Sequence, residues 1–74
     1  MNPIKYWESE ATKIDYPLEW EIEIAELDIS IRIIPKINKQ EFNSTITYWE
    51  GAIDILSENN SLLGEGYMEL TGYN

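Results

Sequence analysis

Two carboxylates in the chain lie next to aromatic residues, and this pairing is the strongest chemical signal in the sequence. Glu50 ends the tripeptide YWE at 48–50, and Glu69 ends the tripeptide YME at 67–69. Aromatic neighbours exclude water from a carboxyl group, which raises its pKa and suits it to donate a proton as a general acid. The alternative is that both are ordinary polar-face residues of a sheet, and Glu69 does follow the polar phase of its segment.

The composition excludes most other kinds of catalytic site. The 74 residues include 14 acidic and five basic side chains, with no cysteine and no histidine. Without these two residue types there is no Ser-His-Asp triad, zinc finger, iron–sulfur cluster or redox motif. The net charge of −9 repels the phosphate backbone of nucleic acid, which is therefore not an expected partner. We expect no cofactor.

The densest run of acidic residues is Glu19, Glu21 and Glu23, which share one face of an extended strand. Such a run could hold a hard cation, but calcium takes six to eight oxygens that converge from loops. No loop of the sequence has that density of acids. The interpretation we favour is a solvated outer face, and we predict no metal site.

The aromatic residues suggest a binding site instead of a catalytic one. Trp20, Tyr48, Trp49 and Tyr67 are candidates to line a pocket for a flat or polyene-like ligand. The alternative, which is the more common role of such residues, is the core of a small sheet.

The hydrophobic pattern is typical of β-strands along the whole chain. Apolar and polar residues alternate with a period of two over 18–24 and again over 27–33. Pro35 ends the second run because proline cannot donate to a ladder of hydrogen bonds. Further strands are expected over 4–8, 44–57 and 62–73.

The run over residues 44–57 changes phase. Tyr48 occupies an even position and Ile53 an odd one, so a regular strand cannot place both on one face. One extra residue within 49–52 would restore the phase, and Gly51 is a residue type that bulges prefer. We therefore predict a β-bulge in this segment.

Two glycines occupy alternate positions in the last run. Gly64 and Gly66 lie on the same face of the expected strand. Without side chains they leave room for a neighbouring ring to pack on the backbone, a role that needs no ligand. We treat Gly51, Gly64 and Gly66 as structural positions.

The strands add up to one all-β domain over residues 1–74, an antiparallel up-and-down sheet of about five strands. Five strands cannot close a barrel with room for a ligand, which needs about eight. The two edges must therefore be exposed, covered or paired with another chain, so we expect a homo-oligomer or a partner chain. No apolar run is long enough to span a membrane, and no signal peptide is recognisable. The chain as it stands reads as cytoplasmic.

At the last two runs the sequence resembles a known family. The segments YWEGA at 48–52 and GEGYMELTGY at 64–73 resemble the C-terminal signature of the AttH/carotenoid 1,2-hydratase family. Upstream, Trp7-x-Ser9, Tyr16-Pro17-x-x-Trp20 and Gln40-Glu41 resemble the same family in the same order. The chain departs from it at Glu10 and Lys13, where a proline and a glycine are expected.

The resemblance implies a lipocalin-like, or calycin, architecture. Family members resemble two such barrels in tandem, and this chain is similar to the closing strands of the second, which implies a half-barrel. Their activities include hydration of an isoprenoid double bond, and many are described as secreted hydrolases, so the parent family is often extracytoplasmic. No catalytic residue is carried over from the family to this chain.

Three hypotheses follow from these observations. In the leading one, the chain is a half-barrel that is not catalytic by itself and binds a hydrophobic small molecule or forms part of a composite barrel. In the second, it is a hydratase- or hydrolase-like enzyme acting on an isoprenoid-type substrate, in which Glu50 or Glu69 protonates an alkene. In the third, it is a structural subunit that completes the barrel of another protein.

Overall fold

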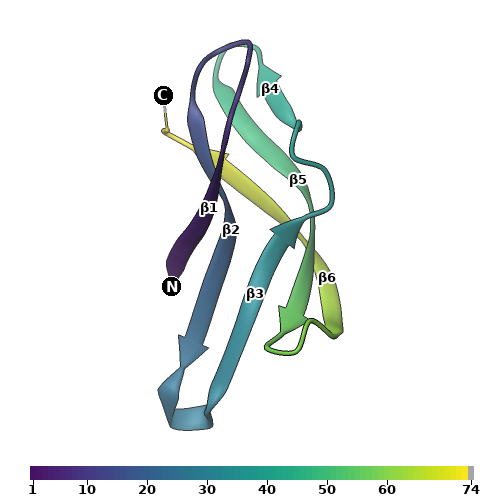
Figure 1. Ribbon diagram of the computed structural model, residues 1–74. Helices are drawn as coiled ribbons and strands as arrows, with labels where there is room; N and C mark the ends of the chain where they lie inside the picture. Colours follow the sequence, from purple (N-terminus) through teal and green to yellow (C-terminus); the bar gives the residue numbers. More distant parts are fainter. Residues whose placement is uncertain (74) are drawn as a thin grey trace.

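The computed structural model describes residues 1–73 as a single antiparallel sheet without any α-helix (Figure 1). This confirms the predicted all-β class and the open, half-barrel character of the sheet. The elements in chain order are β1 (Asn2–Glu8), β2 (Asp15–Ile24), the short 3-10 turn η1 (Ala25–Leu27), β3 (Ile29–Pro35), β4 (Glu41–Asn43), β5 (Thr47–Ser57) and β6 (Leu62–Thr71).

The six strands occupy five positions in the sheet. The order is β1-β2-β3-β5, and β6 pairs with β5 along the edge that β3 leaves free. The short β4 shares with β3 one edge of β5: β3 pairs with Ile53–Ser57 and β4 pairs with Thr47–Trp49. The result is the up-and-down arrangement expected from the sequence, with one position divided between two strands.

The predicted bulge within residues 49–52 is wrong, because β5 pairs with β6 in continuous register from Tyr48 to Ile55. The irregularity lies on the other edge of β5, in the segment 36–40 that joins β3 to β4. Five residues, 36–40, run opposite only three residues of β5, 50–52, because Pro35 pairs with Ile53 and Glu41 pairs with Trp49. The phase break in the sequence has a simpler cause, since Tyr48 belongs to the opposite face of the sheet from Ile53.

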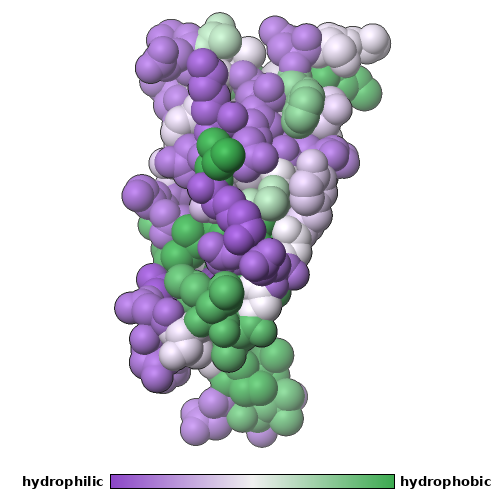
Figure 2. All heavy atoms as spheres, turned by 90° about the vertical axis from the view of Figure 1, so that its right-hand side faces the viewer, coloured by the Kyte–Doolittle hydropathy of each residue, from purple (hydrophilic) through white to green (hydrophobic). Residues whose placement is uncertain are grey.

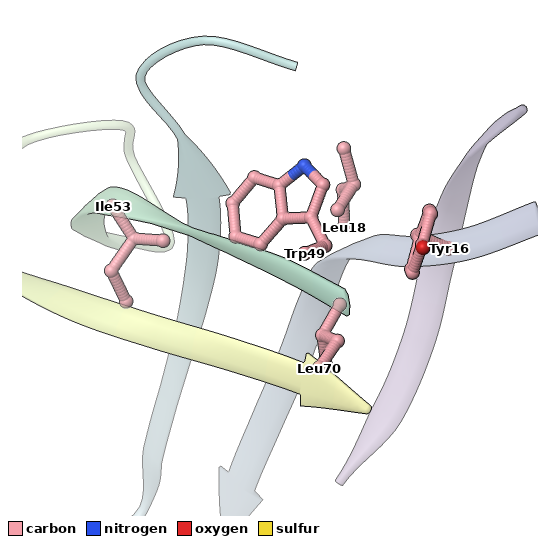
Figure 3. Packing of buried hydrophobic residues seen from close by; sticks show 5 residues of the cluster. All are labelled: Tyr16, Leu18, Trp49, Ile53 and Leu70. Carbon is pink, nitrogen blue, oxygen red and sulfur yellow. The ribbon is translucent and has the colours of Figure 1, made fainter. Parts of the chain in front are cut away.

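Two faces of the sheet can be distinguished. The inner face carries the buried core, which consists of Tyr16, Leu18, Trp49, Ile53 and Leu70 from β2, β5 and β6 (Figure 3). The sheet curls so that β6 passes across β2 in Figure 1, and Leu70 reaches the β2 side chains. The indole of Trp49 is fully buried and donates its N–H to the Asn38 carbonyl oxygen at 2.7 Å. The core therefore fills the curled part of the sheet with the protein's own side chains.

The opposite end of the molecule is formed by the β2–β3 and β5–β6 turns, and we call residues 24–31 and 57–63 the turn end. The molecule is elongated, with extents of 41 × 19 × 18 Å, and the core does not reach this end. Apolar side chains are exposed here instead, and hydrophobic residues gather over the lower part of the surface in Figure 2. The exposed ones are Ile24, Leu27, Ile29, Leu62 and Leu63.

Candidate functional site

The two candidate acids lie together on the outer face, which we define by Tyr48, Glu50, Tyr67 and Glu69. Glu50 and Glu69 are directly opposite each other on β5 and β6. Within residues 1–73 neither takes part in an ion pair. Slight desolvation of the hydroxyl and the nearby Glu50 carboxylate raise the pKa of Tyr67. The sheet thus brings the two carboxylates together, on the face opposite the buried Trp49.

The four candidate ligand-binding aromatics are divided between the two faces. Trp20 and Trp49 lie on the inner face, where Trp49 belongs to the core and the half-buried Trp20 packs against it. Tyr48 and Tyr67 lie on the outer face, and Tyr48 stacks on Phe42 with ring centroids 5.3 Å apart. The four side chains therefore do not line one common pocket.

The three glycines have different surroundings. At Gly51 a methyl group would overlap the side-chain amide of Gln40, which donates a hydrogen bond to the Ile37 carbonyl oxygen at 2.7 Å. Gly66 faces the side chain of Ile53, from which an added methyl would be 3.6 Å away, and the space above Gly64 is open. Glycine at position 51 thus leaves room for the Gln40 amide, and neither of the other two glycines carries an aromatic ring.

A cluster of hydroxyl groups around Glu41 was not predicted from the sequence. The Glu41 carboxylate accepts hydrogen bonds from Ser9 Oγ at 2.6 Å, Thr12 Oγ1 at 2.7 Å and Tyr16 OH at 2.6 Å. These donors come from the β1–β2 loop and the start of β2, whereas Glu41 begins β4. The network therefore fastens the β1–β2 hairpin to β4, next to the core.

The electrostatics of this cluster favour an ionised carboxylate. Burial by itself would raise the pKa of Glu41, but the donors on Ser9, Tyr16 and Thr12 outweigh it and lower that pKa. Burial, together with the hydrogen bond to Glu41 and its charge, raises the pKa of Tyr16. A carboxylate that is held ionised by three donors is an anchor, and it is a poor general acid.

The one signal for this cluster lay in the family-like motifs. Ser9, Tyr16 and Glu41 belong to three different motifs that resemble the family, and nothing within any one motif indicates that these residues are in contact. Ser9 and Glu41 are 32 residues apart in the sequence. A contact at that separation follows from the pairing of strands, so no local spacing could reveal it.

An open groove of about 530 Å³ lies at the turn end, between the start of β3 and the β5–β6 turn. It forms because Ile29 and Ser30 pair with β2 but extend past the end of β5, whose pairing with β3 stops at Ile31. Apolar side chains of Ile29, Ile31 and Leu63 line it, with Asp28 and Glu58 among its polar lining residues. This groove is an apolar surface left uncovered on the described chain, and we take it as the candidate functional site.

Two classes of site find no support in the geometry. Within residues 1–73 no three acidic side chains are grouped closely enough to hold a metal ion. The same residues contain no helix with the length and hydrophobicity of a membrane span.

The fold and groove define a class: an open antiparallel β half-barrel with a filled core at one end and an uncovered apolar groove at the other. The family model described as AttH-like matches residues 1–73, so the chain belongs to the AttH-like family. This confirms the family resemblance noted in the motifs. Searches of the curated proteins and of the solved structures gave no match to this chain.

Proposed function

We propose that this chain is a lipocalin-like half-barrel of the AttH-like family that binds a hydrophobic small molecule and is not catalytic by itself. The observation that carries the proposal is the uncovered apolar groove at the turn end. Leu63 is 60% exposed and Ile29 41% exposed, although both line a concave surface. Apolar side chains gathered in a concavity are typical of sites for small ligands.

The size of the groove sets an expected affinity. Covering the apolar lining of the groove is worth roughly 1 kcal/mol, the ligand's own apolar surface adds a few kcal/mol, and the cost of association offsets part of this gain. We therefore expect a dissociation constant on the order of millimolar for a single small ligand. Such an affinity suits a carrier or a partly completed site.

The placement of the carboxylates supports binding over catalysis. The enzyme hypothesis requires Glu50 or Glu69 to protonate an alkene held in an apolar pocket. Both lie on the outer face, whereas the groove is formed by Asp28–Ile31 and the β5–β6 turn. If hydration of an isoprenoid double bond is detected and is lost in Glu50→Gln/Glu69→Gln, the enzyme hypothesis replaces ours.

We also propose that the sheet edges pair with another chain, either a second copy or a protein that supplies further strands. Within residues 1–73, no strand covers the outer edge of β1 or of β6. Uncovered edges present unpaired backbone donors and acceptors, which another strand can satisfy. Sedimentation at micromolar concentration tests this, and a stable monomer in the absence and presence of candidate partners would count against it.

The ligand proposal is tested by titrating the protein with farnesol, a neutral apolar alcohol, and following tryptophan fluorescence. Trp20 is a suitable reporter because it packs on the inner face, two residues before Ile22, whose cross-strand partner Ile31 lines the groove. We expect saturable binding that Leu63→Asp weakens at least about fivefold, since a charge in the groove opposes burial of an apolar ligand.

A matched control is available in Ile37→Asp, because Ile37 is 62% exposed, as Leu63 nearly is, but lies in the segment between β3 and β4. This variant introduces the same charge away from the groove and is expected to bind farnesol as the parent protein does. Binding that is absent, or that falls equally in both variants, would refute the proposal.

A further inference from the structure

The rim of the groove is acidic on both sides. Asp28 lines it from the β2–β3 turn and Glu58 lines it from the β5–β6 turn. Glu26 lies in the neighbouring turn η1. No lysine or arginine lines the groove. An apolar floor between two carboxylates is therefore the chemistry that a ligand would meet.

Arg32, the basic residue nearest in sequence to the rim, does not itself line the groove. Arg32 lies on the opposite face of β3 from Ile31, where Glu21 of β2 is its direct cross-strand partner. The chain as a whole carries a net charge of −9, which adds a long-range negative field at low salt. An anionic headgroup such as a carboxylate would be repelled from the groove, and a cationic headgroup would be attracted.

The remaining polar lining residues fit the same conclusion. Ser30 lines the groove next to the two carboxylates, and its hydroxyl oxygen can accept a hydrogen bond from an N–H donor. A volume of about 530 Å³ lies within the range of small-molecule sites and is small for a folded partner. A second copy of the chain brings the same acidic end and the same negative charge, which argues against it as the occupant.

We propose that the groove binds a cationic amphiphile, whose apolar tail lies on Ile29, Ile31 and Leu63 and whose ammonium or guanidinium head lies between Asp28 and Glu58. This inference rests on the proposed function, since it names the ligand class of the same groove. The acidic rim favours a positively charged headgroup, and the apolar floor buries the tail of any apolar ligand, whatever its charge.

The test compares three ligands with the same decyl tail, each used below its micelle concentration. They are decyltrimethylammonium, the neutral decyldimethylamine oxide, and undecanoate, titrated at neutral pH and followed by tryptophan fluorescence and calorimetry. At low salt we expect the cation to bind about tenfold tighter than the neutral ligand and the anion to bind weaker than either. The preference should shrink at about 0.5 M salt because exposed charges are screened.

The double variant Asp28→Asn/Glu58→Gln isolates the rim. Asp28 has a φ of 52°, a left-handed conformation that asparagine adopts well, so the turn is expected to persist. This variant should bind the neutral ligand unchanged and lose the preference for the cation. The control Glu8→Gln/Glu10→Gln removes the same charge at exposed positions of the other end and should keep the preference.

The outcomes separate the two proposals. Binding of the neutral ligand without preference for the cation would overturn the charge selection and leave the proposed function intact. A preference that survives in Asp28→Asn/Glu58→Gln, or that falls equally in the control, would also overturn it, because net charge alone would then be the cause. Tight binding of a basic amphipathic peptide with none of the decyl cation would overturn it in favour of a protein partner. Absence of binding by all three decyl ligands would overturn both proposals.

Discussion

The Glu41 network makes a quantitative prediction about folding. Its carboxylate accepts three hydrogen bonds of 2.6–2.7 Å from Ser9, Thr12 and Tyr16. Within residues 1–73, these are the only side-chain hydrogen bonds that link the β1–β2 hairpin to β4. Replacing Glu41 by glutamine keeps the shape of the side chain and removes its charge. The hairpin should then be held less firmly against the rest of the sheet.

The magnitude follows from the type of hydrogen bond. Bonds to a charged acceptor contribute about 1.5–3 kcal/mol each, and neutral bonds contribute about 0.5–1.5 kcal/mol. The amide oxygen of glutamine can retain the donors of Thr12 and Tyr16 as neutral bonds, while its amino group faces the Ser9 hydroxyl. Allowing for non-additivity, we expect Glu41→Gln to lower the free energy of unfolding by about 2 kcal/mol. For a domain of this size the melting temperature would fall by about 10 °C.

The effect should depend on pH in a defined direction. The pKa of Glu41 is lowered in the folded state from its ordinary value of 4.5. A lowered folded pKa means that the carboxylate stabilises the fold fully above the ordinary value, and that this stabilisation is lost as the pH falls through the folded pKa. The difference between the parent protein and Glu41→Gln should thus be largest near neutral pH and should shrink in acid.

Urea unfolding followed by tryptophan fluorescence at neutral pH and at about pH 3 measures both quantities. Glu10→Gln is the control, because Glu10 is an exposed acid of the same loop and makes no side-chain hydrogen bond among those described. If Glu41→Gln unfolds at the same urea concentration as the parent at neutral pH, or if its deficit is undiminished in acid, the assignment of Glu41 as a charged anchor is refuted.

Three further variants test local features of the sheet by the same unfolding assay. Gly51→Ala should lower the free energy of unfolding by about 1–2 kcal/mol, because the added methyl displaces the Gln40 amide and breaks its hydrogen bond. Adding Gln40→Ala to this variant should recover part of the loss, and additive losses in the double variant would contradict the reasoning. Lys13→Gly should raise the free energy of unfolding by up to about 1 kcal/mol, since Lys13 has a φ of 63° that glycine adopts without strain. A lower free energy of unfolding would show that the turn does not strain lysine. Glu69→Gln should gain about 0.2–1 kcal/mol at low salt by relieving repulsion from Glu50 across the strands, and an unchanged midpoint would argue against that repulsion.

Much of the fold can be predicted because each strand is recognisable from the pattern of residues in its own segment. The alternation over 18–24 and 27–33 depends only on which face each side chain must occupy. The first run lies within β2, and the second forms β3 from Ile29 onward, with Leu27 in the turn η1. The open sheet followed from the number of strands. The family-like motifs were equally local, and the match over residues 1–73 confirms them.

The errors arose where the partner strand decides the outcome. The phase change near Gly51 was read as a bulge in its own strand, but the extra residues lie opposite it, in the segment 36–40. The absence of a side chain at Gly51 makes room for the Gln40 amide, and no pattern within residues 44–57 contains that information. The same holds for Glu41, whose donors come from a distant hairpin.

The division of the candidate aromatics between faces has a related cause. Residues close in sequence, such as Tyr48 and Trp49, point to opposite sides of a strand because side chains alternate. Aromatic residues that are neighbours in the sequence are therefore divided between the two faces of the sheet. One of these contributes to the core, and the other lies beside Glu50 on the outer face.

The family motifs and the groove occupy different parts of the chain, and this affects what family membership can say about function. The motif segments lie at 7–9, 16–20, 40–41, 48–52 and 64–73, and they supply most of the core, most of the Glu41 network and the Gly51 contact. The groove is formed by residues 28–31 and 57–63, outside all of these segments. The motifs therefore account for how the sheet is held together and include no residue that lines the groove. A substrate known for one AttH-like protein cannot be transferred to this chain through the motifs, and the ligand must be inferred from the apolar floor and acidic rim of its own groove.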